Sequence, residues 1–235
     1  DPMIKSYQDT MAQAKAALKQ AETTIQTMDK AIALLINSID SYSPERGSWE
    51  IAFVNAHCIN VAAKNLPYLK ILRNSKAVFP DGSGIKKAGT MLGTAIVDNV
   101  NGTDMFPILC REFAKAGKHM YLLGSGPGIA EKTAIWANNI AGTPIIAGYH
   151  DGFFTPESLN SVIKDINTAA PDLLLVALGV PRQELWIHDN LASLHVPVCM
   201  GVGGLFDFYS GRILRAPKVL RHLGFEWVWR LLMEP

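Results

Sequence analysis

The sequence predicts an α/β fold built on a mainly parallel β-sheet with helices on both faces. From residue 49 onward, short apolar runs bounded by glycine, proline or asparagine alternate with stretches of helical pattern, an order typical of parallel strands joined by crossover helices. Such runs suit strands that are buried on both faces. With 235 residues and 49% hydrophobic side chains, the chain is able to bury the core that a Rossmann-like sheet of this kind needs.

A long helical region is predicted to precede the sheet, over residues 1–48. Residues 4–39 are rich in Ala, Gln and Lys and contain no Gly or Pro, and apolar side chains recur at helical spacing from Met28 to Leu35. Residues 49–235 are predicted to form the α/β domain, with room for two closely packed subdomains.

Six apolar runs are the predicted strands. They cover residues 51–54, 77–79, 120–123, 144–147, 173–177 and 198–202. The helix expected after the third strand carries Ile129, Thr133, Trp136 and Ile140 along one stripe, and this stripe is predicted to pack on the sheet.

Polar or glycine-rich segments follow most of these strands. They are Asn55, Pro80 to Gly82, Gly124 to Gly128, Gly179 to Pro181, and Gly201 to Gly204. In parallel sheets, ligands bind beyond the carboxyl ends of the strands. One crevice is therefore expected to collect these segments.

Composition excludes several classes of function. Lys and Arg total 22 against 21 for Asp and Glu, so no overall positive field favours nucleic acid. The three cysteines are widely spaced in apolar surroundings, which predicts reduced core thiols rather than disulfides or a zinc site. No secretory signal pattern and no apolar run of about 20 residues occurs, so a cytoplasmic protein is expected, with surface attachment to a membrane still open.

The segment from Gly124 to Gly128 has a strand, loop and helix layout that suits phosphate binding by backbone amides. Ile129 occupies the third glycine position of a dinucleotide fingerprint, and no Lys-Ser/Thr pair of a P-loop follows. Nucleotide contact and a merely tight turn both remain open from this motif.

Asp81 lies between Pro80 and Gly82, just past an apolar strand. A carboxylate there is able to act as a general base on a hydroxyl nucleophile. An aspartate beside glycine is also common in turns and helix caps, so this segment alone leaves both roles open. Residues 82–84 are expected to open another helix, whose N-terminus favours negative charge.

Arg212, Arg215, Lys218 and Arg221 lie close together near the C-terminus. They suit either a diphosphate or a solvated helical face, and the aromatic residues from Phe225 to Trp229 suit either core packing or a membrane surface. No D-x-D, no metal-binding histidine spacing and no G-x-S-x-G occurs. The sequence therefore predicts neither a metal site nor a serine nucleophile.

Eight motifs taken together resemble the WecG/TagA/CpsF glycosyltransferases. They are T-M-D-K-A-I from Thr27, V-N-A from Val54, V-F-P-D-G-S-G from Val78, N-G-T-D from Asn101, Y-L-L-G-S-G-P-G from Tyr121, G-Y-H-D-G-F-F from Gly148, V-A-L-G-V-P-R-Q-E from Val176 and G-V-G-G-L-F-D-F from Gly201. The resemblance runs collinearly from about Thr24 to the C-terminus.

This resemblance implies a metal-independent, inverting transferase without a cofactor, which moves a sugar from a UDP donor to a polyprenyl-diphosphate-linked saccharide. The sugar would be of N-acetylmannosamine, uronate or glucose type, used in teichoic acid, enterobacterial common antigen or exopolysaccharide synthesis. The enzyme would lie at the inner face of the cell membrane and contact it through its C-terminal region, and the resemblance leaves homo-oligomers open.

The resemblance also implies roles for individual residues. Asp81 matches the catalytic base. Asn55, Gly82, Ser83, Asn99, Asp104 and Gln183 match groups around the sugar and acceptor. Gly124, Ser125, Gly126, Gly128, Tyr149, Gly152, Phe153, Gly201, Gly203 and Gly204 match the surroundings of the nucleotide. Arg212, Arg215 and Arg221 are expected to meet the diphosphate or the membrane.

Four features depart from the family pattern. Phe53 replaces a threonine, and Asn99 stands where an arginine is expected. The long Ala-, Gln- and Lys-rich helix takes the place of a short first strand. The chain stops at Pro235, so a basic C-terminal appendage is expected to be missing.

Two other functions stay in competition. A nucleotide-cofactor oxidoreductase is suggested by the layout around Gly124. A non-catalytic membrane-associated binding protein is suggested by the basic, aromatic C-terminal segment.

Overall fold

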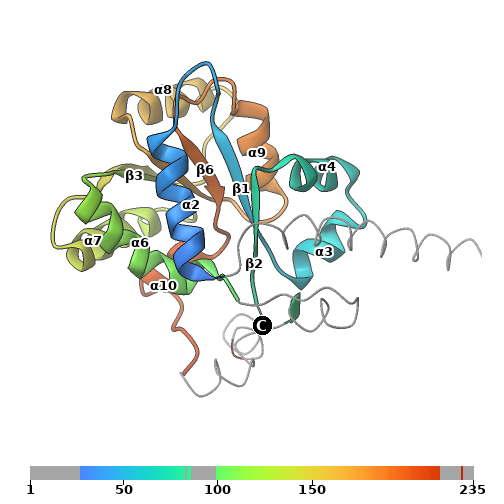
Figure 1. The fold of residues 1–235 in the computed structure, drawn as a ribbon, viewed down its shortest axis with the longest axis horizontal. Coiled ribbons are helices and arrows are strands. Elements are labelled where there is room, and N and C mark those ends of the chain that lie inside the picture. The colour runs from blue at the N-terminus through green and yellow to red at the C-terminus, as the bar shows by residue number, and fades with distance from the viewer. Residues whose placement is uncertain (1–26, 83, 86–98, 218–228, 230–235) are drawn as a thin grey trace, which may run out of the picture.

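The computed structural model describes residues 27–82, 84–85, 99–217 and 229. Its centre is a six-stranded sheet in the order β2-β1-β6-β5-β3-β4, in which all neighbouring strands run parallel (Figure 1). The strands are β1 (Trp49–Val54), β2 (Ala77–Pro80), β3 (Met120–Gly124), β4 (Ile146–His150), β5 (Leu173–Ala177) and β6 (Val198–Gly201). The predicted α/β class and parallel sheet are confirmed.

Helices cover both faces of the sheet. They are α2 (Met28–Asp40), α3 (Ala56–Ala62), α4 (Leu66–Asn74), α6 (Gly102–Ala116), α7 (Ile129–Ala141), α8 (Leu159–Ala169), α9 (Arg182–Asn190) and α10 (Leu205–Tyr209). One layer contains α2, α6, α7 and α10, with α2 in front of the sheet in Figure 1, and the other contains α3, α4, α8 and α9.

Strand β5 shows why the strands read as continuous apolar runs. Leu173 and Leu175 pack into the layer of α2, α6 and α7, whereas Leu174 and Val176 pack against α8 and α9. Because successive side chains of a strand point to opposite faces, a strand covered on both sides is apolar at nearly every position. Burial of each leucine contributes roughly 1.5–3 kcal/mol.

Helix α2 is packed directly on the sheet. The Thr27 hydroxyl accepts from the Lys30 amide at 3.4 Å and caps the helix, and Ala31, Leu35 and Ile39 belong to the same buried core cluster as the strand residues. The described end of the predicted N-terminal helical region is therefore held by the core of the α/β fold.

Strands β1 and β4 and helix α7 differ in detail from the sequence expectation, and β1 begins two residues earlier than predicted, at Trp49. Strand β4 begins at Ile146, two residues later than predicted, and runs on through Tyr149 to His150. The Asn138 side chain accepts from the amides of Ile145 and Ile146 at 2.8 and 3.1 Å, which ties the segment before the strand to α7.

On α7 the expected stripe is only partly right. Thr133 is fully buried, whereas Ile129, Trp136 and Ile140 are partly buried and pack against the same core, and the other buried positions of the helix are alanines. Alanines let the helix lie close to the sheet, so the larger side chains flank the contact.

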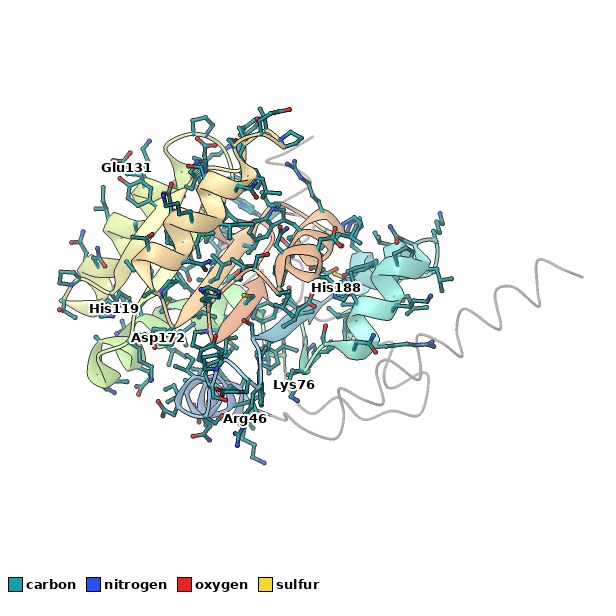
Figure 2. The ribbon with its side chains drawn as sticks, turned by 90° about the horizontal axis from the view of Figure 1, so that it is seen from above. Arg46, Lys76, His119, Glu131, Asp172 and His188 are labelled. Atoms are coloured by element: carbon teal, nitrogen blue, oxygen red, sulfur yellow. The ribbon has the colours of Figure 1, made fainter. Side chains whose placement is uncertain are left out.

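At the amino ends of the strands, a pair of hydrogen bonds joins the segments that precede β3 and β5. His119 precedes β3 and Asp172 precedes β5, and the two residues lie side by side in Figure 2. The His119 amide donates to Asp172 Oδ2 at 2.7 Å, and the Asp172 amide donates to the His119 carbonyl at 2.9 Å. This pair sets the register in which β3 and β5 start.

The chain connections create a switch point between β3 and β5. The connection after β3 runs through α7 on one face, whereas the connection after β5 runs through α9 on the other. Loops diverge at such a point and leave room for a ligand beyond the strand ends.

Candidate functional site

Most of the segments predicted to carry function follow the carboxyl ends of the strands. In sheet order they are Asp81 after β2, Asn55 after β1, Gly203 after β6, Gly179 after β5, Ser125 after β3 and Asp151 after β4. Because all strands are parallel, these segments lie along the same edge of the sheet.

Asp81 is held by backbone contacts from both sides. Its amide donates to the Val54 carbonyl at 2.8 Å, which continues the ladder between β1 and β2. On the other side the Val100 amide donates to the Pro80 carbonyl at 2.9 Å. The half-buried Asp81 carboxylate therefore stands on a rigid support, as a catalytic group requires.

Asn99 supports the same turn. Gly82 has a positive φ of 90°, a backbone conformation that glycine adopts without steric cost, and its amide donates to Asn99 Oδ1 at 2.6 Å. This contact positions the backbone next to Asp81. Ser83, which was predicted beside these residues, lies outside the described part of the chain.

Two asparagines at this edge cap helices. Asn55 Oδ1 accepts from the Cys58 amide at 3.0 Å at the start of α3. Asn101 Oδ1 accepts from the Asp104 amide at 2.7 Å, and Asn101 Nδ2 donates to Asp104 Oδ2 at 2.7 Å. The caps stabilise each helix by about 1 kcal/mol. Within the described residues, Asn55 Nδ2 makes no hydrogen bond, so this nitrogen is the polar atom that Asn55 offers to a ligand.

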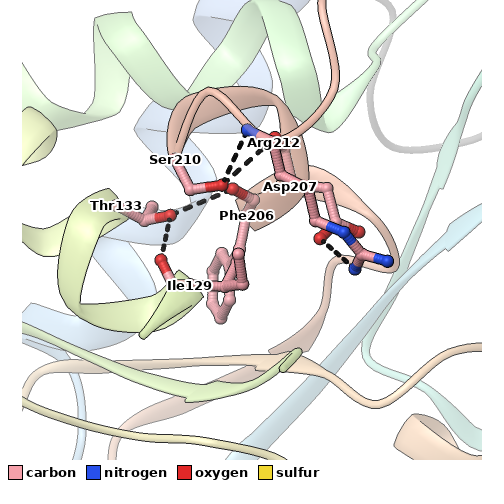
Figure 3. A network of polar contacts seen from close by, with 6 residues as sticks. All are labelled: Ile129, Thr133, Phe206, Asp207, Ser210 and Arg212. Carbon is pink, nitrogen blue, oxygen red and sulfur yellow. Dashed lines mark hydrogen bonds and ion pairs between the residues drawn. The ribbon is translucent and has the colours of Figure 1, made fainter. Parts of the chain in front are cut away.

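Two of the predicted arginines are carried to this region by the segment after α10. Arg215 Nη2 lies 2.7 Å from Asp104 Oδ1, so two predicted site residues pair with each other. Arg212 Nη1 lies 3.1 Å from Asp207 Oδ1, and the Arg212 amide donates to Ser210 Oγ at 3.3 Å (Figure 3).

The sequence left open that Arg212 and Arg215 lie on a helical face. In the structure they do not, because the chain from residue 211 to 217 is irregular. Figure 3 also shows how α10 is fixed: the Thr133 hydroxyl of α7 lies 3.1 Å from the Phe206 carbonyl. Arg221 lies outside the described residues.

Three loops interlock around Gly124. The Ser125 amide donates to the Ala177 carbonyl at 2.8 Å, and the Gly152 amide donates to the Ser125 carbonyl at 2.9 Å. Gly124 has φ 128°, and a Cβ there would lie 2.4 Å from the Ala177 oxygen. A Cβ on Gly152 would lie 2.9 Å from Leu178. Glycine is therefore required where the loops after β3, β4 and β5 meet.

The start of α7 presents unused backbone donors. Gly128 has φ 75° and caps the helix without a side-chain hydrogen bond. In the described part of the chain, the amides of Gly126 and Gly128 donate no backbone hydrogen bond. Such amides, together with the positive end of the helix dipole, suit a phosphate.

Exposed aromatic side chains lie near this loop, on β4 and in the segment that follows it. Phe153 is 77% exposed and Tyr149 is 46% exposed. The Tyr149 hydroxyl donates to Glu131 Oε1 at 3.2 Å, and the negative charge of Glu131 raises the pKa of Tyr149. Exposed rings beside amide donors are the groups that a nucleoside base and its phosphates would use.

Gln183 is buried, with both ends of its side-chain amide hydrogen-bonded. Gln183 Oε1 accepts from the Gly203 amide at 2.9 Å, and Gln183 Nε2 donates to Glu184 Oε1 at 2.8 Å. A Cβ on Gly201 would lie 2.7 Å from Gln183 Nε2. Gln183 thus joins the start of α9 to the end of β6 and the loop that follows.

Two buried acids were missed by the sequence reasoning. Glu184 is 0% exposed and Glu50 is 7% exposed. Burial raises the pKa of Glu184 to about 7. Burial, together with the charge of Glu184, raises the pKa of Glu50 to about 8. Their signal in the sequence is a single acid inside an otherwise apolar strand, Glu50, and an acid in the first turn of a packed helix, Glu184.

Phe53, which departs from the family pattern, is a core residue under the same edge. It is 8% exposed, and its ring meets that of Phe79 edge-on at 5.4 Å. A Cβ on Gly102 would lie 3.2 Å from Phe53 Cε2. Phe53 and Leu205 line a small apolar hollow at this place, so the ring supports the site from below.

Other predictions concern cysteines, metals and membrane spans. Cys58, Cys110 and Cys199 are buried free thiols, as expected. The described residues contain no group of three His, Cys, Asp or Glu side chains placed to hold a metal ion. Within the described ranges, no helix is both long and apolar enough to traverse a bilayer.

Comparison of the sequence with known proteins identifies a family. The model of the glycosyl transferase WecG/TagA/CpsF family matches residues 18–235. The N-acetylglucosaminyldiphosphoundecaprenol N-acetyl-beta-D-mannosaminyltransferase of Bacillus subtilis (strain 168) is 33% identical over 189 residues, which cover 79% of this chain and 72% of that protein.

The interlocked loops predict a large cost for a side chain at position 124. We expect Gly124→Ala to lower the free energy of unfolding by about 3 kcal/mol, because strain at positive φ of roughly 1–2 kcal/mol adds to an overpacking cost of roughly 1–3 kcal/mol. Gly142→Ala is the matched control, since Gly142 has φ 72° with no atom near the added Cβ, and should cost about 1 kcal/mol. Equal losses in urea unfolding would contradict the steric argument.

The buried acids predict how stability depends on pH. The pKa values of Glu50 and Glu184, about 8 and about 7, lie above the ordinary value of 4.5, so between these values the folded state binds more protons than the unfolded state. The free energy of unfolding should therefore fall as the pH rises from about 5 to 8. Urea unfolding across this range should give a flatter profile for the double variant Glu50→Gln and Glu184→Gln; an unchanged slope would contradict the assignment.

Proposed function

Because the chain belongs to the WecG/TagA/CpsF family of glycosyltransferases, we propose that it transfers a sugar from a UDP donor to a polyprenyl-diphosphate-linked saccharide in bacterial surface polysaccharide synthesis. The observation that carries this proposal is the placement of Asp81 and the amide-rich loop of Gly124–Gly128 at one edge of the sheet. In this proposal Asp81 is the base for the acceptor, and the loop is the cradle for the donor phosphates.

The proposed donor is UDP-N-acetylmannosamine and the proposed acceptor is N-acetylglucosaminyl-diphospho-undecaprenol. The support is the name of the Bacillus subtilis relative, which specifies this acceptor and an N-acetyl-beta-D-mannosaminyl group. A uronate- or glucose-type donor is the alternative within the same reaction class. The lipid acceptor also favours a place at the inner face of the cell membrane, contacted through the C-terminal region.

The proposed reaction is a single displacement that inverts the anomeric centre. The Asp81 carboxylate takes the proton of the acceptor hydroxyl, and the hydroxyl oxygen forms its bond to the anomeric carbon. The bond from that carbon to the diphosphate oxygen breaks, and UDP leaves from the opposite side with the bonding electron pair. Backbone contacts on both sides of Asp81 support this role, because they hold the backbone that carries the carboxylate in place without help from the substrate.

Negative charge that develops on the leaving diphosphate needs fixed positive partners. The amides of Gly126 and Gly128 and the N-terminus of α7 are the proposed backbone partners. Arg212 and Arg215 are the proposed side-chain partners, with Arg221 from the segment that follows. The ion pairs with Asp207 and Asp104 orient the two described arginines. In this proposal no metal ion is required.

Nucleotide binding provides a direct test of the donor class. At about 100 times its Kd, UDP should stabilise the folded state by about 2.7 kcal/mol and raise the Tm by about 5 °C or more. UDP-sugars should do the same, whereas NAD(H) should leave the Tm unchanged. A shift with NAD(H) and none with any uridine nucleotide would instead favour the oxidoreductase.

The Asp81→Asn variant tests the base. Because the amide has nearly the shape of the carboxylate but takes up no proton, kcat should fall by about 10²–10⁴-fold, with UDP affinity within about twofold of the unchanged protein. Asp189→Asn, at an exposed position on α9, is the matched control and should keep full activity. UDP release coupled to the lipid-linked acceptor measures both, and near-normal turnover of folded Asp81→Asn would refute the assignment.

A further inference from the structure

A buried carboxyl group lies behind the candidate site and takes no direct part in the proposed chemistry. Glu184, in the first turn of α9, is 0% exposed. Its Oε1 accepts from Gln183 Nε2 at 2.8 Å, and its Oε2 has no hydrogen-bond partner in the described part of the chain. A buried carboxyl with an unsatisfied oxygen destabilises a fold, so its presence calls for a reason other than stability.

The surroundings of Glu184 make its burial more costly. Glu50 on β1 is a second buried acid, and its Oε1 also lacks a partner among the described residues. Burial, and in addition the negative charge of Glu184, raises the pKa values of Glu50, of Tyr68 on α4 and of Cys58 on α3. His188, labelled on α9 in Figure 2, lies with its Nδ1 3.7 Å from Glu50 Oε2. Two acids and two weakly acidic groups therefore share an interior with little compensating charge.

The hydrogen bond from Glu184 leads outward to the edge of the sheet. It holds one end of the Gln183 amide, and the other end of that amide accepts from Gly203 N–H at 2.9 Å. Without an acceptor for Nε2, the amide would keep only one of its two anchors, and its rotation about the last side-chain bond would be less restricted. Gly203 lies in the loop between β6 and α10, which leads on to Arg212.

We propose that Glu184 is a positioning residue for sugar transfer: it orients the Gln183 amide, and through Gly203 it fixes the loop between β6 and α10 at the edge of the site. This inference rests on the proposed function for its effect on turnover. Its structural part, the control of Gly203 by Glu184, is independent of any substrate. The unsatisfied acid is thus retained for geometry and at the expense of stability, a trade-off common at active sites.

The test compares three variants of the full chain. Glu184→Met removes the acceptor and fills a similar volume. Glu184→Gln keeps an oxygen that accepts from Gln183. Glu50→Met removes the second buried acid, which makes no hydrogen bond to Gln183, and serves as the matched control. Glu50→Met should leave the Tm unchanged or raise it, because a buried unsatisfied group is lost. Glu184→Met exchanges the unsatisfied Glu184 Oε2 for an unsatisfied Gln183 Nε2, so its Tm should change little.

Amide hydrogen exchange of Gly203, followed by NMR, reports on the positioning directly. We expect exchange about tenfold faster in Glu184→Met, and kcat about tenfold lower with little change in the donor KM, a size typical for loss of an orienting partner. Glu184→Gln and Glu50→Met should match the unchanged protein in both measurements. If Glu184→Met does not fold, Glu184→Asp applies the same test, because it draws the acid back by one methylene.

Two results would overturn the proposal. One is unchanged Gly203 exchange in folded Glu184→Met, whatever happens to turnover. The other is an equal effect of Glu50→Met, which would show a general response to altered burial. If the unchanged protein transfers no sugar while Gly203 exchange still responds as expected, the proposed function fails and the positioning role of Glu184 stands.

Discussion

Parallel hydrogen bonding along β2-β1-β6-β5-β3-β4 brings the carboxyl end of every strand to the same edge of the sheet. Residues far apart in the chain, such as Asn55, Asp81, Ser125 and Gly203, reach that edge because each directly follows a strand. The order of the strands in the sheet, not the order of residues in the chain, therefore decides which groups meet. Side chains on both faces of strands β3, β5 and β6 are buried, which makes this support rigid.

The loops at the edge are held mainly by backbone contacts. Ser125 bonds to the Ala177 carbonyl and receives the Gly152 amide, while Asp81 continues the ladder from Val54. Backbone contacts of this kind depend on strand register and leave side chains available for chemistry. They also explain the glycines, because a Cβ at Gly124 would meet the neighbouring strand. Glycine at such positions thus allows close packing of the loops. In the described part of the chain, the amides of Gly126 and Gly128 donate no backbone hydrogen bond.

The buried acids behind the site lower the stability of the fold, whereas the backbone contacts of the loops stabilise it. The pKa values of Glu50 and Glu184 rise because the interior disfavours their charged forms. An apolar pair would pack there at lower free energy. The connection from Glu184 through Gln183 to Gly203 gives one of these acids a geometric role. Stability lost in the interior and order gained at the edge are two effects of the same group.

Much of the fold was determined by the sequence alone. Continuous apolar runs such as 173–177 were assigned correctly as buried parallel strands, because strands covered on both faces are built mainly from apolar residues. Local rules did less well at β4, where a contact from Asn138, eight residues earlier in the chain, joins the segment before the strand to α7. The motif around Asp81 was recognised from the sequence, but its backbone support was not visible there.

Tertiary structure decided which polar residues share contacts. Asp104 with Arg215, Asn99 with Gly82, and Gln183 with Gly203 are each well separated in the chain, and no local pattern predicts such pairs. The burial of Glu184 was equally invisible, since its sequence neighbours Arg182 and Gln183 are polar. The sequence by itself determined the strands, the glycine loops and the likeness to a glycosyltransferase family. The partners of each site residue follow only from strand order and packing, because contact depends on distance in space.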